Sequence, residues 1–446
     1  MNIFLILPNQ LFEITSQHLK TSHYDKIIIY EEPHYFSSDI KPNKIKIAFL
    51  RSCMKCYYDK LKKEGFNITY VEFHQSSPLT TSNNYYCYEL TDFKLTDKYK
   101  KFKINELTTP MFILTKSDLD IYNKKQSISH ASLYELSKKK LNLLQGVKNQ
   151  DVYNRSNPRK DIPLNTNLNF ITSSNKHYYE EGIKYANSSY FKSHYGNPTL
   201  EYLKIYPINS KDSYEAFKTF LSSNLDKFGL FQDVIQDTNP FMYHSIISPM
   251  LNNGLLLPLH LIEIIKDFNK THKIPLNAYE GFLRQIIGWR EYMRFIYLYK
   301  YNELISSNNH KNYKSLDKSW YTATTGILII DTEINKALKY GYAHHIIRLM
   351  VFLNFMILNE INPNDIYKWF MEVISIDAYD WVMISNIYSM GYFSKIGMKR
   401  PYLSSSNYLL KMSNYKKDGK WDTIWTDKFR SFVKSRKINF YLRSIK

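Results

Sequence analysis

The segment Met1-Asn-Ile-Phe-Leu-Ile-Leu-Pro8 opens the chain with an uncharged, mostly apolar run. It has neither the cationic start nor the small-residue cleavage site of a secretion signal, and it favours a first β-strand at residues 3–7. Residues 45–64 have helical periodicity and end at Gly65, a typical helix stop. Three more apolar runs predict buried strands, at residues 26–30, 68–73 and 111–114. This alternation predicts an α/β domain with a parallel, Rossmann-like sheet over residues 1–125.

The rest of the chain changes character after this domain. Residues 126–215 are polar and interrupted by Asn, Pro and Ser, which predicts a long interdomain connector with some helix. Helical patterns then dominate, at residues 213–228, 255–268, 277–305, 331–358 and 363–373. We therefore expect an all-α domain over residues 216–446.

Composition narrows the class of protein. The 446 residues suffice for two or three domains, and no apolar run approaches the roughly 18–20 residues that cross a bilayer, so no membrane partner is expected. Only three cysteines occur, which favours an intracellular protein, cytoplasmic or nuclear, without a disulfide framework. The formal charge of +19 favours a polyanionic partner such as nucleic acid, although an AT-rich genome would also enrich lysine.

Arginine is the more informative basic residue, because it supplies only 11 of the 60 Lys and Arg residues. Its planar fork suits contact with phosphate or carboxylate. Arg284, Arg290 and Arg294 all fall within one expected helix. Gly288 lies in the same helix, where it costs about 1 kcal/mol relative to Ala. We expect either a close approach to its backbone or tight helix packing.

Two shorter motifs have alternative interpretations. Cys53 and Cys56 have the spacing of a redox or metal site, but no second Cys or His pair lies nearby, so we prefer incidental helix residues. Ser245 and Ser248 precede a helix-like segment. They are expected either to cap that helix or to donate to a phosphate at its start.

The adjacent pair His344 and His345 lies beside Arg348 in an apolar stretch. Histidine is the side chain whose unperturbed pKa lies nearest neutrality, so such a pair can hold or pass a proton. Asp377 follows about thirty residues later and is the kind of partner such a group needs. The alternative is a pair of structural histidines.

The end of the chain is basic and aromatic. Residues 399–446 hold 13 Lys and Arg against 3 acidic residues. A solvated face is the simple explanation. Interleaved aromatic residues also suggest a surface that holds a nucleic-acid backbone and splayed bases: Tyr402, Tyr408, Trp421 and Trp425.

Together these motifs resemble the photolyase/cryptochrome superfamily, and most closely its prokaryotic branch of iron–sulfur (6-4) photolyases, the photolyase-related proteins. The matching stretches occur in the family's order, at residues 243–249, 280–292, 342–350, 376–382 and 401–415. Looser matches lie at residues 9–11, 131–134 and 158–163.

The resemblance implies an FAD inside the helical domain, beneath a cavity that faces DNA. It implies ten cofactor-binding residues: His244, Ser245, Ser248, Gln285, Trp289, Arg290, Arg348, Asp377, Tyr379 and Asn386. Arg290 is expected to pair with Asp377 beside the flavin ring. His344, His345 and Tyr402 would face the lesion as catalytic residues, and Trp369 would relay electrons. A lumazine-type antenna chromophore is one possibility for the N-terminal domain.

One departure from the family is large. Ile329, Lys416 and Gly419 stand where three of the four cluster cysteines are expected, and three cysteines in the whole chain cannot supply a [4Fe–4S] cluster. We expect no iron–sulfur cluster and no other metal. We expect packed side chains to occupy the position of the cluster, with residues 327–330 and Trp421 as candidates.

The leading hypothesis is a monomeric, light-driven DNA photolyase that acts on ultraviolet (6-4) photoproducts, with histidine-mediated proton transfer. The alternatives are a cyclobutane-dimer photolyase, a cryptochrome-like flavin photoreceptor without repair, and a DNA-binding protein that has lost its cofactor.

Overall fold

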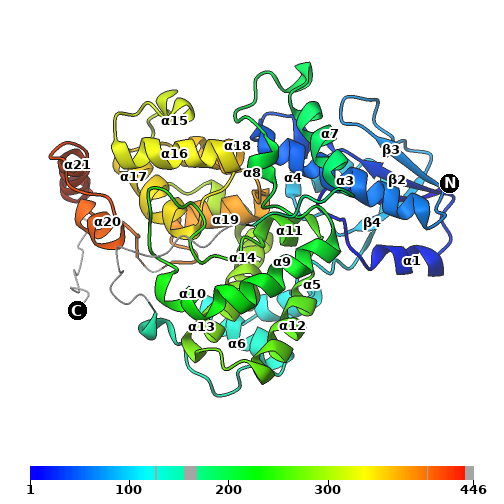
Figure 1. Ribbon diagram of the computed structural model, residues 1–446, viewed down its shortest axis with the longest axis horizontal. Coiled ribbons are helices and arrows are strands. Elements are labelled where there is room, and N and C mark those ends of the chain that lie inside the picture. The colour runs from blue at the N-terminus through cyan, green and yellow to red at the C-terminus, as the bar shows by residue number, and fades with distance from the viewer. Residues whose placement is uncertain (126–127, 155–167, 399, 437–446) are drawn as a thin grey trace.

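The computed structural model describes residues 1–125, 128–154, 168–398 and 400–436. The motif at 158–163 therefore lies outside the described residues. A parallel α/β domain occupies one end of the molecule, and helices form the rest (Figure 1). The end of α21 lies at the opposite side from the N-terminus. Among the described residues, no helix combines the length and apolarity required to cross a bilayer.

The sheet of the N-terminal domain is parallel throughout, with strand order β3-β2-β1-β4-β5. Its strands are β1 (Asn2–Ile6), β2 (Lys26–Tyr30), β3 (Ile68–Val71), β4 (Asn84–Tyr88) and β5 (Lys103–Leu107). Strand β1 is central and pairs Ile3 with Lys26 and Ile6 with Ile29. Because both faces of this strand are covered, its sequence is a continuous apolar run.

The helices that follow or connect these strands are α1 (Thr15–Thr21), α2 (Pro33–Phe36), α3 (Lys44–Lys63), α4 (Phe93–Tyr99), α5 (Lys116–Asn123), α6 (His130–Lys140), α7 (Lys176–Ala186) and α8 (Leu200–Leu203). Helix α7 belongs to the expected connector but packs on α3. The contact is close, because a Cβ on Gly182 would lie 2.5 Å from the carbonyl oxygen of Ala48.

The helical part of the chain comprises α9 (Ser210–Ser223), α10 (Leu225–Phe231), α11 (Ser248–Asn253), α12 (Pro258–Thr271), α13 (Leu276–Leu283), α14 (Arg290–Ile305), α15 (Ser319–Thr322), α16 (Leu328–Tyr340), α17 (Asn354–Leu358), α18 (Pro363–Val373), α19 (Asp380–Met390), α20 (Ser406–Met412) and α21 (Trp421–Ser435). Two π-helical stretches, Arg284–Trp289 and Ile347–Leu353, adjoin α14 and α17. Such π-stretches are frequent at functional sites.

Gly288 lies in the first of these π-helical stretches and is approached by α6. A Cβ at this position would lie 3.1 Å from His130 Nε2 and 3.1 Å from a ring carbon of Tyr134. The glycine thus allows the close backbone approach that its mid-helix position indicated.

Three expectations about local structure were wrong. Residues 111–114 form no strand, because the backbone N–H groups of Ile113 and Leu114 donate to the buried carboxylate of Glu291, at 2.9 and 3.2 Å, instead of to a neighbouring strand. The helix expected at 331–358 is interrupted at Gly341, whose φ of +62° ends α16. The helix expected at 213–228 is divided into α9 and α10 at Asn224.

Candidate functional site

Three histidines gather where two loops meet the start of a helix. His344 and His345 follow the break at Gly341, so His344 precedes the helix and His345 begins it. His244 lies in the loop before α11, between two residues with left-handed backbone, Met242 and Ile246, at φ +47° and +54°. A β-branched residue in that region is strained. Such strain is concentrated at functional sites.

The histidines form a continuous chain of hydrogen bonds. His244 Nδ1 lies 3.0 Å from the carbonyl oxygen of Phe241, and His244 Nε2 lies 3.2 Å from His345 Nδ1. His345 Nε2 lies 3.0 Å from Asp233 Oδ1, in the turn after α10. His344 stacks on His244 with ring centroids 4.6 Å apart. We call His244, His344, His345 and Asp233 the histidine cluster.

This chain of hydrogen bonds fixes where the protons lie. A carbonyl and a carboxylate only accept, so His244 donates from Nδ1 and His345 donates from Nε2. Burial, the largest cause, and the nearby His345 lower the pKa of His244 to about 3, so its Nε2 carries no proton near neutral pH. His345 therefore bridges His244 Nε2 and the carboxylate of Asp233.

Exposure distinguishes the members of the cluster. The side chain of His345 is 49% exposed, whereas His344 and Asp233 are buried. Burial also holds the pKa of His344 well below its usual range. The cluster therefore presents one solvent-facing imidazole, which donates from Nε2 to the buried Asp233.

A second polar group lies around Asp377, next to the start of α19. Arg348 Nη2 donates to Asp377 Oδ1 and Oδ2, at 2.9 and 3.0 Å, and Ser248 Oγ donates to Asp377 Oδ2 at 2.6 Å. The expected pair of Arg290 with Asp377 is therefore wrong. Arg290 donates instead to Asn252 Oδ1, because α11 lies between the two. Neither serine caps the helix α11 through its side chain.

Arg290 lies against aromatic rings. Its guanidinium carbon is 4.8 Å from the ring centroid of Trp381 and 5.0 Å from that of Phe112. Burial lowers the pKa of Arg290 to about 10. Its Nε and the indole N–H of Trp381 are both buried without a hydrogen-bond partner among the described residues. These orphaned donors indicate space for an acceptor.

The remaining expected cofactor residues lie in the π-stretch Arg284–Trp289 and at or in α19. Trp289 Nε1 donates to Asn386 Oδ1 at 3.1 Å, so these two meet. Gln285 is exposed and donates to the carbonyl of Gly281. Tyr379 is buried against Tyr35 of the α/β domain, and its hydroxyl has no partner among the described residues.

The other expected aromatic residues lie outside this region and pack against the core. Trp369 is fully buried, donates to the carbonyl of Trp320 at 2.8 Å, and lies 4.9 Å from Phe352. Tyr402 is half-buried against the core. The suggestion that Trp421 and Trp425 form part of a base-binding surface was wrong, because both are buried; Trp425 stacks on Phe355 at 4.4 Å.

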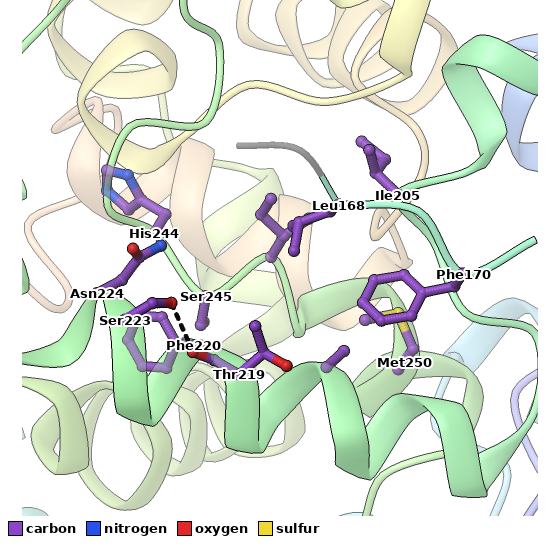
Figure 2. A pocket seen from close by; sticks show the side chains of 12 residues that line it. Leu168, Phe170, Ile205, Thr219, Phe220, Ser223, Asn224, His244, Ser245 and Met250 are labelled. Carbon is purple, nitrogen blue, oxygen red and sulfur yellow. Dashed lines mark hydrogen bonds between the residues drawn. The ribbon is translucent and has the colours of Figure 1, made fainter. Parts of the chain in front are cut away.

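A small cavity adjoins the histidine cluster (Figure 2), and the space inside it that a water-sized molecule can reach is about 20 Å³. His244, Ser245, Ser223 and Asn224 lie on its polar side, and Leu168, Phe170, Ile205 and Met250 on its apolar side. That volume holds about one water and is far below the roughly 300–1,000 Å³ of ligand pockets. The Oδ1 of Asn224 is buried without a partner among the described residues. The polar side chains here and at Arg290 are of the kind that contact a dinucleotide such as FAD, but the cavity itself is too small to contain one.

Three polar residues of these groups were not expected from the sequence: Asp233, Asn252 and Asn224. The pair Asn252-Asn253 before Gly254 was a visible signal, since side-chain amides next to a glycine turn often bind backbone. Asp233 gave no signal, because its partner lies 112 residues away in sequence.

Comparisons with known proteins agree with this architecture. Residues 4–201 match the family model described as deoxyribodipyrimidine photo-lyase-related protein. A (6-4) photolyase of Agrobacterium fabrum is 37% identical over 212 residues, which is 47% of this chain. The chain spans only 42% of that relative's length.

Three solved structures share the fold. A class III photolyase from Agrobacterium tumefaciens aligns with a TM-score of 0.63 at 16% identity, covering 98% of this chain and 88% of the other. A cryptochrome from Synechocystis aligns at 0.61 and 14% identity, covering 98% and 89%. A photolyase from Sulfolobus tokodaii, solved with two FAD molecules, aligns at 0.53 and 14% identity, covering 90% and 85%.

Proposed function

We propose that this chain, whose residues 4–201 match the photolyase-related family model and whose fold is that of photolyases and cryptochromes, is a light-driven DNA photolyase that repairs (6-4) pyrimidine photoproducts with the help of FAD. The observation that carries the proposal is His345, a half-exposed imidazole that is hydrogen-bonded to His244 and Asp233. A light sensor without repair would not require such a proton donor. A (6-4) lesion requires proton transfer during its rearrangement.

His244, Ser245 and Asn224 would hold the cofactor at the cavity, and Arg348 with Asp377 would lie at its redox-active end. Reduced FAD would supply, on illumination, the electron that the lesion accepts. The pair of Arg348 and Asp377 places a fixed cation and anion next to each other, and such a pair tunes the charge of a bound group. Arg290, with its unpartnered Nε, would offer a further donor.

His345 would act as the proton store of the reaction. Its Nδ1–H or Nε2–H would pass to the electron-loaded lesion and return when the electron leaves, so no proton is consumed. Asp233 and His244 hold the ring in place through hydrogen bonds to its two nitrogens. His344 supports the stack from the buried side.

Ultraviolet-damaged DNA is the proposed partner. Flipping a damaged base costs a few kcal/mol, less than for an intact pair, which gives part of the selectivity. The formal charge of +19 fits contacts with phosphates, so binding should weaken steeply with added salt.

The test is illumination of the FAD-loaded protein with oligonucleotides that carry a single defined lesion. We expect light-dependent repair of the (6-4) lesion and none in the dark. Repair of only the cyclobutane dimer would show that the substrate is that lesion and not the (6-4) photoproduct. A flavin-bound protein that repairs neither lesion would favour the photoreceptor. A protein that binds DNA but no flavin would contradict both.

A further inference from the structure

We infer that His244, His344 and His345 form a binding site for a divalent transition-metal ion of the Zn²⁺ type. Occupation of this site would withdraw His345 from a DNA lesion, and that second consequence rests on the proposed function. The site itself depends only on the three imidazoles and their neighbours.

The spacing of the ring nitrogens fits coordination. One nitrogen from each histidine lies within 4.8 Å of the other two. Zn²⁺ binds imidazole at about 2.0–2.1 Å with tetrahedral angles, which separates two ligand nitrogens by about 3.3–3.4 Å. His244 Nε2 and His345 Nδ1 are 3.2 Å apart. Two of the three ligands are therefore already at the required separation.

The two rings also have the outer contacts of metal ligands. A ligating histidine usually donates its other ring N–H to a carbonyl or a carboxylate, which fixes the tautomer and the ring orientation. His244 donates from Nδ1 to the carbonyl of Phe241, and His345 donates from Nε2 to Asp233. Both rings therefore direct the opposite nitrogen toward the shared position.

His344 supplies the independent indication of a ligand. It is 1% exposed, and its Nδ1 is buried with no hydrogen-bond partner among the described residues. A buried polar atom without a partner costs roughly 1–3 kcal/mol. A ring rotation that brought a nitrogen of His344 to the metal would remove the cost of leaving this side chain unpartnered.

The ligand chemistry selects the class of ion. Three neutral imidazoles suit Zn²⁺, Cu²⁺ or Ni²⁺, whereas Mg²⁺ and Ca²⁺ prefer oxygen ligands. The exposed side of His345 leaves room for a fourth ligand, water, as in open three-histidine sites. The same exposure makes the site accessible from solution.

The binding test uses the full-length, tag-free protein in the dark and without DNA. Zn²⁺ is titrated calorimetrically, and Co²⁺ is titrated with difference absorption in the visible region, where tetrahedral coordination is recognised. We expect one ion per chain. His345→Gln should weaken binding most, and Asp233→Asn should weaken it by about 10–100-fold, as loss of an outer partner does. The matched control is His23→Gln, because His23 is exposed and outside the cluster.

Equal affinity in the wild type and in His345→Gln would overturn the site, as would the absence of stoichiometric binding. Because His345 is half-exposed, its substitution should not unfold the protein, and circular dichroism checks this.

A second arm measures photorepair with and without Zn²⁺. We expect inhibition that a chelator reverses in the wild type. If repair is absent even without Zn²⁺, the proposed function fails, and the binding titration still decides the metal site. If Zn²⁺ binds through His345 but repair is not inhibited, the inference that the metal withdraws His345 from the lesion is overturned.

Discussion

Two buried polar clusters in this molecule differ in how they meet solvent. The histidine cluster ends at the half-exposed His345. The second, which we call the aspartate cluster, lies between the α/β domain and α19 and consists of Asp92, Asp380, Tyr35 and Tyr367. Tyr35 donates to Asp92 at 2.7 Å, and Tyr367 donates to Asp380. Both aspartates are buried. Strongly perturbed groups occur in both clusters, but only the first has a member that a substrate can reach.

The two clusters also respond oppositely to pH. Burial lowers the pKa of His244 to about 3, so the native state keeps it neutral. Its contribution to stability is present above the unfolded value of about 6.5 and is lost as the pH falls toward 3. Burial raises the pKa of Asp92 to about 7. Its contribution is present below the unfolded value of about 3.9 and is lost as the pH rises through 7.

The largest expected effect concerns the histidine cluster. His345→Ala removes the solvent-facing proton donor, and we expect (6-4) photorepair to fall by about 10²–10⁴-fold, the usual contribution of general acid–base catalysis. Flavin content and unfolding midpoint should stay near wild type, because the side chain is half-exposed. Single-turnover repair under saturating light measures the effect.

His23→Ala is the control for this substitution, since it removes an exposed histidine elsewhere. Unchanged repair in His345→Ala would show that this half-exposed position carries no chemistry. The difference in exposure between the histidine cluster and the aspartate cluster would then not indicate a difference in function.

An intermediate effect, on the pH dependence of stability, is expected from the aspartate cluster. Asp92→Asn removes the carboxylate whose raised pKa costs stability at higher pH. The free energy of unfolding of the variant, relative to wild type, should therefore increase as the pH rises from 5 to 8. Urea unfolding at several pH values measures this difference, and a difference that is constant or falls with pH would contradict the assigned direction.

His244→Gln tests the opposite slope. Relative to wild type, the variant should become comparatively more stable as the pH falls from 6.5 to 4.5, because the unfavourable protonation of a buried ring no longer contributes. If His244→Gln does not fold on its own, the urea unfolding midpoint is compared instead between variant and wild type with a ligand bound. The same slope in both variants would mean that neither cluster controls the pH dependence.

The sequence could predict those parts of the fold in which burial is continuous along the chain. Strand β2, Lys26–Tyr30, has the predicted bounds because both faces of the strand are covered and every residue after Lys26 is hydrophobic and buried. Strand β5, Lys103–Leu107, escaped prediction because it is an edge strand with mostly polar, exposed residues. Residues 111–114 are as apolar as a strand, but Glu291 satisfies their backbone. Apolar periodicity reports burial and does not identify the partner of the backbone.

The candidate site was predictable as a set of motifs but not as a set of contacts. The adjacent histidines and Asp377 were visible from residue type and spacing. Which arginine meets Asp377 was not, because Arg290 and Arg348 both lie on helices that face the same region, and only packing places Asn252 beside Arg290. The bond between His244 and His345 joins residues 101 positions apart, and local pattern holds no information on such a contact.

The smallest expected effect concerns one hydroxyl of the aspartate cluster. Tyr35→Phe removes the donor to Asp92 Oδ2 and keeps the ring. At pH 8, where Asp92 is ionised, a buried carboxylate that loses a donor should cost about 1–3 kcal/mol of the free energy of unfolding. At pH 5, where Asp92 is protonated, the loss should be smaller, because a neutral carboxyl group depends less on that donor. Tyr313→Phe is the control, since Tyr313 is 72% exposed and its change should stay within about 0.5 kcal/mol. An equal loss for Tyr35→Phe at both pH values would mean that its hydroxyl does not support a charged Asp92, and that this sealed cluster is held together by packing alone.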